Sequence, residues 1–485
     1  MKRIAHFILL ALCTALLSSN DAFDCFSLIA GKQATVDGSV IVGHNEDDGG
    51  PNFVNVYKIA AEEHHKGETI SLKGGGFLPQ AKNTLGFLWL EIPNQDFADS
   101  YFNDKGVVIT SDACLSREDK PEMTNGGIGF MLRRIVAERA RTAREGVRIA
   151  GELIDQFGYE ASGRTYIIAD ASEGWFLHAV KGKHWIAQRV PDDRVAVIAN
   201  YYTIGRIDLK DKNHFIGSPD IIEYAVKRGW YQPERDGEFD FARVYSDPEN
   251  YKSMVNILRQ WRATSLLSSS EFDIGERFPF SFEPRKKIRA DDFFRVLRDH
   301  NEGTPYDLTN HYKNGSPHAT RLSTICAEST QYSFVAQLRN GPPEEIANLV
   351  WIAFRRPDAN AYSPWYFSIT DPPGNYYRGN AENALRNHFA PNAWHLGDNH
   401  DEAFWSFAKL SELVDRLYRN RIERVQKVWR NFENFAFKDL KNREKEFAYL
   451  LETNRTIAIK IITNYVHNLE YRKWFLASEL LNEFR

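Results

Sequence analysis

Short runs of apolar and β-branched residues, separated by turn residues, dominate the first part of the chain. Residues 25–30 and 39–42 form two such runs on either side of Asp37-Gly38, a dipeptide that favours tight turns, so they predict a β-hairpin. Strand-like pieces continue over residues 51–113, and Asp112 follows the apolar run 107–110 by two residues. The beginning of the chain is therefore predicted to be mainly β-sheet.

The pattern changes to a helical period over residues 128–157, where apolar residues recur every three or four positions. A break near Thr142 and a stop at Gly158 predict two helices. The order strands, helices, strands favours sheets packed against helices over alternating βαβ units, and so predicts an α+β fold. The strands that follow are expected at 165–169, 174–180, 184–189 and 195–198.

Residues 210–320 are polar, aromatic and irregular, with a short helical patch at 291–298. Strand character returns at 332–338 and 350–354. From residue 401 the sequence is rich in Arg, Glu and Leu, has little Gly and no Pro, and predicts a helical C-terminal region.

The first residues are typical of a secretory signal peptide. Lys2 and Arg3 are followed by an apolar run over 8–17 that is too short to span a bilayer, and small residues such as Ala22 offer a cleavage site. The alternative is an N-terminal anchor that stays uncut. We expect an exported protein, periplasmic or secreted, with no membrane span after the leader is removed.

Charge and cysteine content narrow further the class of protein to which the chain can belong. A net charge of −4 over 485 residues argues against a nucleic-acid-binding protein. Cys13 leaves with the leader, so Cys25, Cys114 and Cys326 remain, and an odd thiol in an exported protein is a candidate reactive group. Cys114 and Cys326 are compatible with a disulfide or with two buried reduced thiols.

Cys25 lies just past the leader. A thiol reacts as thiolate, and its ordinary pKa of about 8.5 means that it needs a base or a positive field. The base is either a histidine or, if the chain is cut before Cys25, the α-amine of that cysteine, whose pKa is about 7.7–8.0. Cutting after Ala22 would leave Phe23-Asp24 to be removed, by self-processing or by another cut.

Several motifs occur in a fixed order over nearly all of the chain. They include Cys25-Phe26-Ser27-Leu28, His44-Asn45-Glu46-Asp47, Leu297-Arg298-Asp299-His300, Glu302-Gly303-Thr304-Pro305 and Ala403-Phe404-Trp405. Together they resemble the cysteine-type N-terminal nucleophile (Ntn) dipeptidases, the relatives of bacterial dipeptidase A and the secernins. The resemblance implies an αββα sandwich of two antiparallel sheets between helices, with residues 1–24 as signal peptide and short propeptide, 25–400 as catalytic domain and 401–485 as a helical extension.

The resemblance also implies site residues. Cys25 would attack the amide carbonyl, Asp47 would hold its α-amine, and Asn200 would donate an N–H to the oxyanion. His44 stands where the wider superfamily has an Arg, which questions the usual stabilisation of the thiolate. Further candidates that line the site are Asn45, Asp112, as a partner for a substrate ammonium, and Arg321 as a late superfamily arginine.

Dipeptides are the expected substrates, cleaved without cofactor or metal, and a homo-oligomer is compatible with the sequence. One alternative is an N-acyl amide hydrolase of the bile-salt or penicillin V amidase type. Another is a binding protein that kept the fold and lost catalysis. A metallopeptidase is disfavoured because no His-Glu-x-x-His spacing occurs, and His64-His65 fits a solvated loop better than a metal pair.

Overall fold

The computed structural model describes residues 25–389 and 402–485. The predicted leader, residues 1–24, and the predicted boundary between residues 400 and 401 lie outside the described residues.

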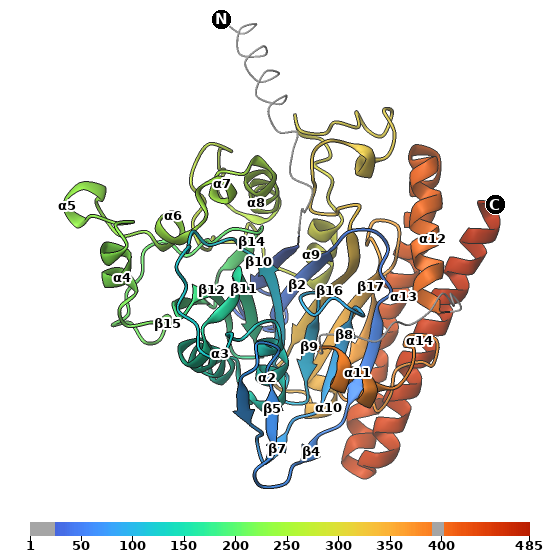
Figure 1. The fold of residues 1–485 in the computed structure, drawn as a ribbon. Helices are drawn as coiled ribbons and strands as arrows, with labels where there is room; N and C mark the ends of the chain where they lie inside the picture. Colours follow the sequence, from blue (N-terminus) through green and yellow to red (C-terminus); the bar gives the residue numbers. More distant parts are fainter. Residues whose placement is uncertain (1–24, 390–401) are drawn as a thin grey trace, which may run out of the picture.

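Two antiparallel sheets form the centre of the protein (Figure 1). In the six-stranded sheet, the hairpin predicted at the start of the chain is flanked by strands from residues 195–198 and 330–338. The order of this sheet is β14 (Val195–Ile198), β1 (Phe26–Ala30), β2 (Val40–Asp47), β16 (Thr330–Leu338), β17 (Asn348–Phe354) and β18 (Ser363–Tyr366).

The second sheet has eight strands. Two short two-stranded ribbons are formed by residues 62–84. Its order is β15 (Phe215–Gly217), β13 (Trp185–Val190), β12 (Gly174–Gly182), β11 (Tyr159–Ala169), β10 (Val108–Ala113), β9 (Ser100–Asn103), β8 (Phe87–Glu91) and β3 (Asn55–Ile59). The ribbons pair β4 (Glu62–Glu63) with β7 (Asn83–Thr84), and β5 (Thr69–Ser71) with β6 (Phe77–Pro79).

The two sheets pack face to face over a large apolar core. The rings of Phe102 on β9 and Phe334 on β16 meet edge to face at 5.0 Å. Gly174 on β12 lets Ile29 of β1 approach closely, since a Cβ there would lie 2.8 Å from Ile29 Cγ2. Polar contacts cross the same space, because Ser100 Oγ lies 2.9 Å from the hydroxyl of Tyr332. The space between the sheets thus holds polar as well as apolar side chains.

Helices α2 (Met131–Arg139) and α3 (Ala143–Phe157) cover the outer face of the eight-stranded sheet with a second apolar core. Thr142 caps α3 by accepting a hydrogen bond from the Glu145 N–H, and Gly158 ends it with a φ of 80°. After α11 (Ala381–Asn387), buried His388 lies between Glu91 and Asp99, with Nδ1–Oε1 and Nε2–Oδ2 distances of 2.9 and 2.7 Å.

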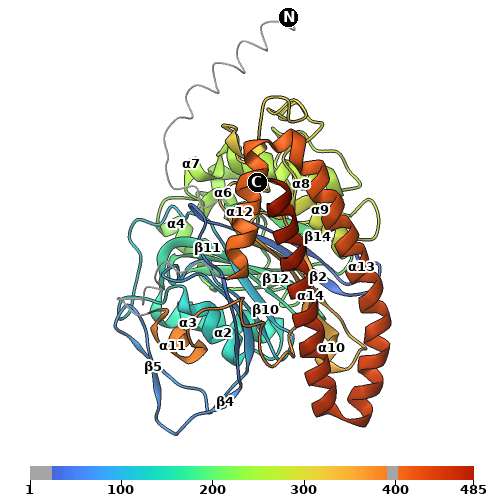
Figure 2. The same ribbon diagram turned by 90° about the vertical axis from the view of Figure 1, so that its right-hand side faces the viewer.

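The outer face of the six-stranded sheet is covered by α9 (Ala290–Leu297) and by the C-terminal helices (Figures 1 and 2). These are α12 (Ala403–Arg416), α13 (Tyr418–Thr453) and α14 (Arg455–Glu483). Figure 2 shows α13 and α14 side by side along most of their length. Helix α8 (Met254–Leu267) packs against β14. Shorter helices are α4 (Ile221–Lys227), α5 (Pro233–Asp236), α6 (Phe241–Tyr245), α7 (Pro248–Tyr251), α10 (Glu344–Ala347) and the 3-10 turn η1 (Pro317–Ala319).

The predicted α+β class, with antiparallel sheets and a helical C-terminal part, is confirmed. Two predicted strand ends need correction, and one helix was not predicted. The polar residues from His44 to Asp47 lie inside β2, because β2 keeps pairing with β16 up to Asp47. Asp112 lies within β10, opposite Thr165, and not beyond the strand. The sequence pattern did not predict α8. None of the helices in the described residues is both long and apolar enough to cross a membrane.

Candidate active site

Cys25 lies immediately before β1 and is buried, with 1% of its surface exposed. Its Sγ donates to Glu46 Oε1 at 3.4 Å and to the main-chain oxygen of Asp47 at 3.7 Å. Burial raises the pKa of the Cys25 thiol well above its ordinary value, and the negative charges of Glu46, Asp112 and Asp47 raise it further. The surroundings therefore keep the thiol protonated until a base is supplied.

His44 and Glu46 point from β2 towards the same side of the sheet, because they are two residues apart on a strand. The imidazole is held from both ends: Nδ1 lies 2.7 Å from Ser27 Oγ, and Nε2 lies 2.9 Å from Glu46 Oε2. Within residues 25–389 and 402–485, the hydrogen bonds of the Cys25 thiol go to Glu46 and Asp47, and not to an imidazole. This arrangement differs from a Cys–His catalytic pair.

Asp112 enters the same space from β10 of the facing sheet. Its Oδ1 lies 3.7 Å from His44 Nδ1, and both side chains are fully buried. Burial raises the pKa of Asp112 to about 6; His44 and Ser27 oppose the shift and Glu46 adds to it. Asp112 therefore changes its charge near pH 6, and its charge acts on the Cys25 thiol.

Arg259 on α8 supplies the positive charge that the sequence analysis missed. It is fully buried, and its guanidinium donates from Nη1 to the main-chain oxygen of Cys25 at 3.3 Å. Nη2 donates to Asn200 Oδ1 and to Asn256 Oδ1, both at 2.9 Å. One cation thus connects the backbone of Cys25 to the side chain of Asn200.

Asn200 follows β14 in a left-handed conformation, with a φ of 54°, which Asn tolerates better than most residues. Because Arg259 can only donate, the amide oxygen of Asn200 must face it, and Nδ2 then donates to the main-chain oxygen of Ala113 at 3.0 Å. Contacts with the described residues use one of the two Nδ2 hydrogens. The other is suited to an oxyanion.

The remaining predicted site residues are spread over other places. Asp47 is buried at the end of β2, and its carboxylate influences the Cys25 thiol through its charge. Asn45 points to the opposite face of the sheet, where Nδ2 donates to the main-chain oxygens of Leu297 and Ile325 at 3.0 and 2.8 Å. Arg321 is exposed, and the contacts described above do not include it.

Glu46 and Arg259 are the two residues at this site that the sequence analysis did not select. Glu46 had a usable signal, since strand alternation from His44 puts it on the same face.

Cys114 and Cys326 are both buried free thiols in the structure. Among the described residues, a group suited to a metal ion is formed by His300, His318, Cys326 and Asp358. It is separate from the contacts of Cys25.

Among known proteins, the chain is similar to several that are named as dipeptidases. The chain is 28% identical over 372 residues to a protein named probable dipeptidase from Salmonella dublin, covering 74% of this chain and 84% of the relative. It is 26% identical over 410 residues to a probable dipeptidase from Latilactobacillus sakei, covering 81% of each chain. A protein named dipeptidase from Bifidobacterium longum is 24% identical over 449 residues, covering 83% of this chain and 80% of the relative.

These relatives, together with a buried cysteine immediately before the first strand, define a hydrolase of the cysteine-type peptidase class. A model of peptidase family C69 matches residues 24–431, which is most of the chain. The protein belongs to peptidase family C69. The resemblance to cysteine-type dipeptidases is therefore confirmed at the level of the family.

Proposed function

We propose that this protein is a dipeptidase in which Cys25, freed as the first residue of the mature chain, is the nucleophile. The observation that carries the proposal is the acidic environment of the buried thiol, made by Glu46, Asp47 and Asp112. Negative charge opposes a lone thiolate but favours an ammonium beside it. An α-amine on Cys25 would take the thiol proton, and the same three carboxylates would stabilise the ammonium that forms.

The reaction follows from this pairing. The α-amine of Cys25 removes the thiol proton, and the sulfur bonds to the peptide carbonyl carbon. The carbon–nitrogen bond then breaks, the ammonium returns its proton to the leaving amine, and a thioester remains. Water, deprotonated by the same amine, hydrolyses the thioester and regenerates the thiol. In this scheme Asp47 holds the α-amine.

Asn200 is the proposed oxyanion donor, with Arg259 as the residue that positions it. The tetrahedral intermediate carries its negative charge on the former carbonyl oxygen, and a preorganised N–H donor there is worth about 2.7–4 kcal/mol in the barrier. The fixed orientation of the Asn200 amide supports this role, since Arg259 and Ala113 hold its two ends.

A cavity of about 320 Å³ begins at the residue after Asn200 and offers room for a substrate side chain. Tyr201, Tyr251, Met254 and Ile257 give it an apolar and aromatic wall, and Arg277, which pairs with Asp240, lies at its edge. This combination supports a small peptide with an apolar side chain as the substrate.

We further infer an αββα Ntn-hydrolase sandwich in residues 25–400, a helical extension in 401–485, and export directed by residues 1–24. Facing antiparallel sheets with helices on both outer faces support the first part. The charged and apolar pattern of the leader supports export. Fractionation of cells that produce the full chain would test it: retention in the cytoplasm with residues 1–24 intact contradicts export.

The decisive experiment combines intact-mass and N-terminal analysis of the purified protein with turnover of Ala- and Leu-containing dipeptides. We expect a mature chain that starts at Cys25, turnover in the wild type, and none in Cys25→Ala. Cys114→Ser is the matched control, because Cys114 is also a buried free thiol.

Three outcomes would contradict the proposal. Full activity with an intact leader or a start at Phe23 refutes the α-amine as base. Turnover of N-acyl amino acids alone assigns the amidase alternative. Absence of turnover on both substrate classes, in a folded protein that starts at Cys25, assigns the binding-protein alternative.

A further inference from the structure

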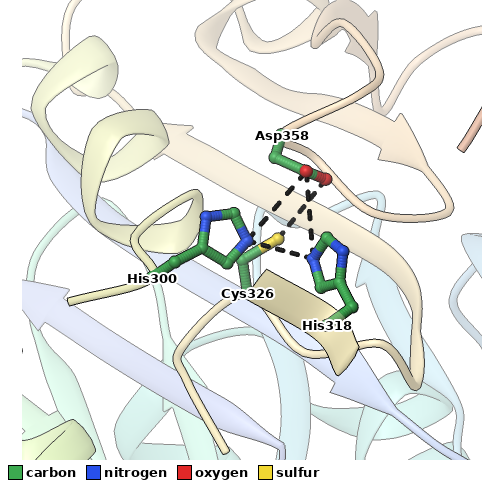
Figure 3. A group of neighbouring side chains, drawn as sticks. All are labelled: His300, His318, Cys326 and Asp358. Carbon is green, nitrogen blue, oxygen red and sulfur yellow. Dashed lines mark hydrogen bonds and ion pairs between the residues drawn. The ribbon is translucent and has the colours of Figure 1, made fainter. Parts of the chain in front are cut away.

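Four side chains from separate parts of the sequence converge on one point (Figure 3). His300 follows α9, His318 lies in η1, Cys326 precedes β16, and Asp358 lies between β17 and β18. The ligand atoms of all four lie within 4.8 Å of one another. Their side chains are shielded from solvent: those of His300, His318 and Asp358 are at most 2% exposed, and Cys326 is 0% exposed, although His318 as a whole residue is only half-buried.

The inner atoms of this cluster are arranged around a common point. His300 Nε2 lies 3.0 Å from His318 Nε2, and Asp358 Oδ2 lies 4.0 and 3.8 Å from these two nitrogens. Cys326 Sγ lies 3.6 Å from Asp358 Oδ1. Ligand atoms at about 2.0–2.3 Å from a tetrahedral ion are separated by roughly 3.3–3.8 Å, which is close to these separations.

The outer atoms of the two imidazoles face carboxylates. His300 Nδ1 lies 3.1 Å from Glu302 Oε1, and His318 Nδ1 lies 2.8 Å from Asp415 Oδ1. Carboxylates accept hydrogen bonds, so each Nδ1 carries a hydrogen, and each Nε2 can direct a lone pair inward once the hydrogen shared between the two Nε2 atoms is released. Two lone pairs, a carboxylate and a thiol then meet at one buried point. This carboxylate–histidine pattern is the one that orients metal-binding histidines.

We propose that His300, His318, Cys326 and Asp358 bind a divalent transition-metal ion, with Zn²⁺ as the ion that fits the set best. Two imidazoles, one thiolate and one carboxylate are ligand types that Zn²⁺ accepts in a closed four-coordinate site. Mg²⁺ and Ca²⁺ require mainly oxygen ligands, which this set lacks. On binding, the Cys326 thiol and the hydrogen-bonded pair of Nε2 atoms each lose a proton to solvent, and the metal–sulfur and metal–nitrogen bonds form.

The position of the site indicates a structural role. Asn45 on β2 points towards it and donates to the main-chain oxygens of Leu297 and Ile325, close to His300 and Cys326 in the sequence. His44 and Glu46 point to the other face of β2, where Cys25 lies. The metal is therefore separated from the nucleophile by the sheet.

The ligands connect three parts of the fold. His300, His318 and Cys326 belong to the long segment between α9 and β16, and Asp358 belongs to the β17–β18 connection. The C-terminal helices join through the second layer of contacts, since Asp415 lies on α12 and the Tyr418 hydroxyl on α13 donates to Asp358 Oδ2 at 2.8 Å. A bound ion would fasten the segment 298–326 to these helices.

The test uses the full chain, purified without added metal and then supplied with Zn²⁺ or Co²⁺. We expect about one zinc per chain by elemental analysis. Bound Co²⁺ should show the visible bands of a tetrahedral site together with a thiolate-to-cobalt charge-transfer band. Cys326→Ser should lose that charge-transfer band, whereas Cys114→Ser, the matched control, should keep it. These spectra do not depend on dipeptidase activity.

Histidine variants separate a site from adventitious binding. His318→Ala should lower the bound metal to well below one per chain, and His311→Ala, an exposed histidine of the same segment, should not. Strong chelation of the wild type should lower the temperature of thermal unfolding, and Zn²⁺ should restore it. A wild type that binds no Co²⁺ with thiolate charge transfer, or whose unfolding temperature chelator and Zn²⁺ leave unchanged, overturns the proposal. This holds even if a variant fails to fold.

Discussion

Replacing Arg259 by Met is expected to lower kcat by about 100-fold while KM changes little, which corresponds to about 2.7 kcal/mol in the barrier. Arg259 donates to Cys25 O and Asn200 Oδ1 at 3.3 and 2.9 Å, and charge-assisted hydrogen bonds of this kind contribute about 1.5–3 kcal/mol each. Without the guanidinium, the amide of Asn200 can rotate, and its Nδ2 no longer faces the developing oxyanion. Arg259 is thus a positioning residue.

A double-mutant cycle tests whether Arg259 acts through Asn200. Asn200→Ala alone should lower kcat by about 10²–10³-fold, because it removes the donor itself. If Arg259 only holds this donor, the double variant should be as slow as Asn200→Ala, and the coupling energy should approach about 2.7 kcal/mol. Arg259→Lys should recover part of the rate, since a single ammonium replaces only some of the hydrogen bonds.

The matched control is Arg262→Met on the same helix. Arg262 pairs with Asp299 through two contacts of 2.6 Å, so its loss removes a guanidinium and its hydrogen bonds from the same helix, away from Cys25. Dipeptide turnover over a range of substrate concentrations and the thermal unfolding of each variant are the measurements. The reasoning is refuted if the kcat losses of Arg259→Met and Asn200→Ala multiply in the double variant, or if Arg262→Met lowers kcat equally at the same stability.

Three further predictions concern pH and local stability. Burial opposes the charge of His388, but its two carboxylate partners outweigh burial and raise the pKa of His388 from 6.5 to about 10. The contribution of His388 to the stability of the fold is therefore complete below about pH 6.5 and is lost as pH rises through about 10. His388→Gln should therefore lower the free energy of unfolding at pH 7 by about 4 kcal/mol, with a difference that shrinks towards pH 10 in urea titrations; a constant difference contradicts the assignment. Asp112, with its pKa of about 6, should give kcat/KM a rise with pH near that value, as its charge comes to stabilise the ammonium of Cys25. Asp112→Asn should abolish that inflection, and its persistence in the variant would assign it to another group. Thr142→Ala should cost about 1 kcal/mol of stability through the lost cap of α3, and an unchanged denaturation midpoint would show that the cap contributes nothing.

Local chemistry explains which parts of the fold were predictable. The helix break at Thr142 and the stop at Gly158 were predictable because a capping hydroxyl and a left-handed glycine act on their immediate neighbours. Helix α8 was not predictable, because Asn256, Arg259 and Gln260 are buried on its inner face and interrupt the apolar period. The missed helix carries the missed cation. From sequence alone, a polar helix face is predicted to be exposed to solvent, because the buried polar residues that it contacts come from distant parts of the chain.

The site shows the same limit. The pattern around Cys25 and His44 indicated a reactive thiol and its companions, but which of four successive polar residues faces the sulfur depends on the register of β2. That register is fixed by partners far along the chain, since His44 pairs with Ser27 on one side and with Phe334 on the other. No local pattern contains this information, because the β16 strand that completes the sheet begins at residue 330.

The register of β2 matters for function because the two faces of this strand serve different sites. Its even-numbered residues His44 and Glu46 face the thiol, whereas odd-numbered Gly43 and Asn45 face α9 and the proposed metal site. A slip by one residue would exchange the two faces: Asn45 would move to the face of the thiol, and Glu46 or His44 would take its place near the main-chain oxygens of Leu297 and Ile325. The alternation of side chains along one strand therefore serves two sites at once. A change in the segment 298–326 is then expected to alter the surroundings of Cys25 through Asn45 and the register of β2. It would not act through a ligand, because the two sites share none.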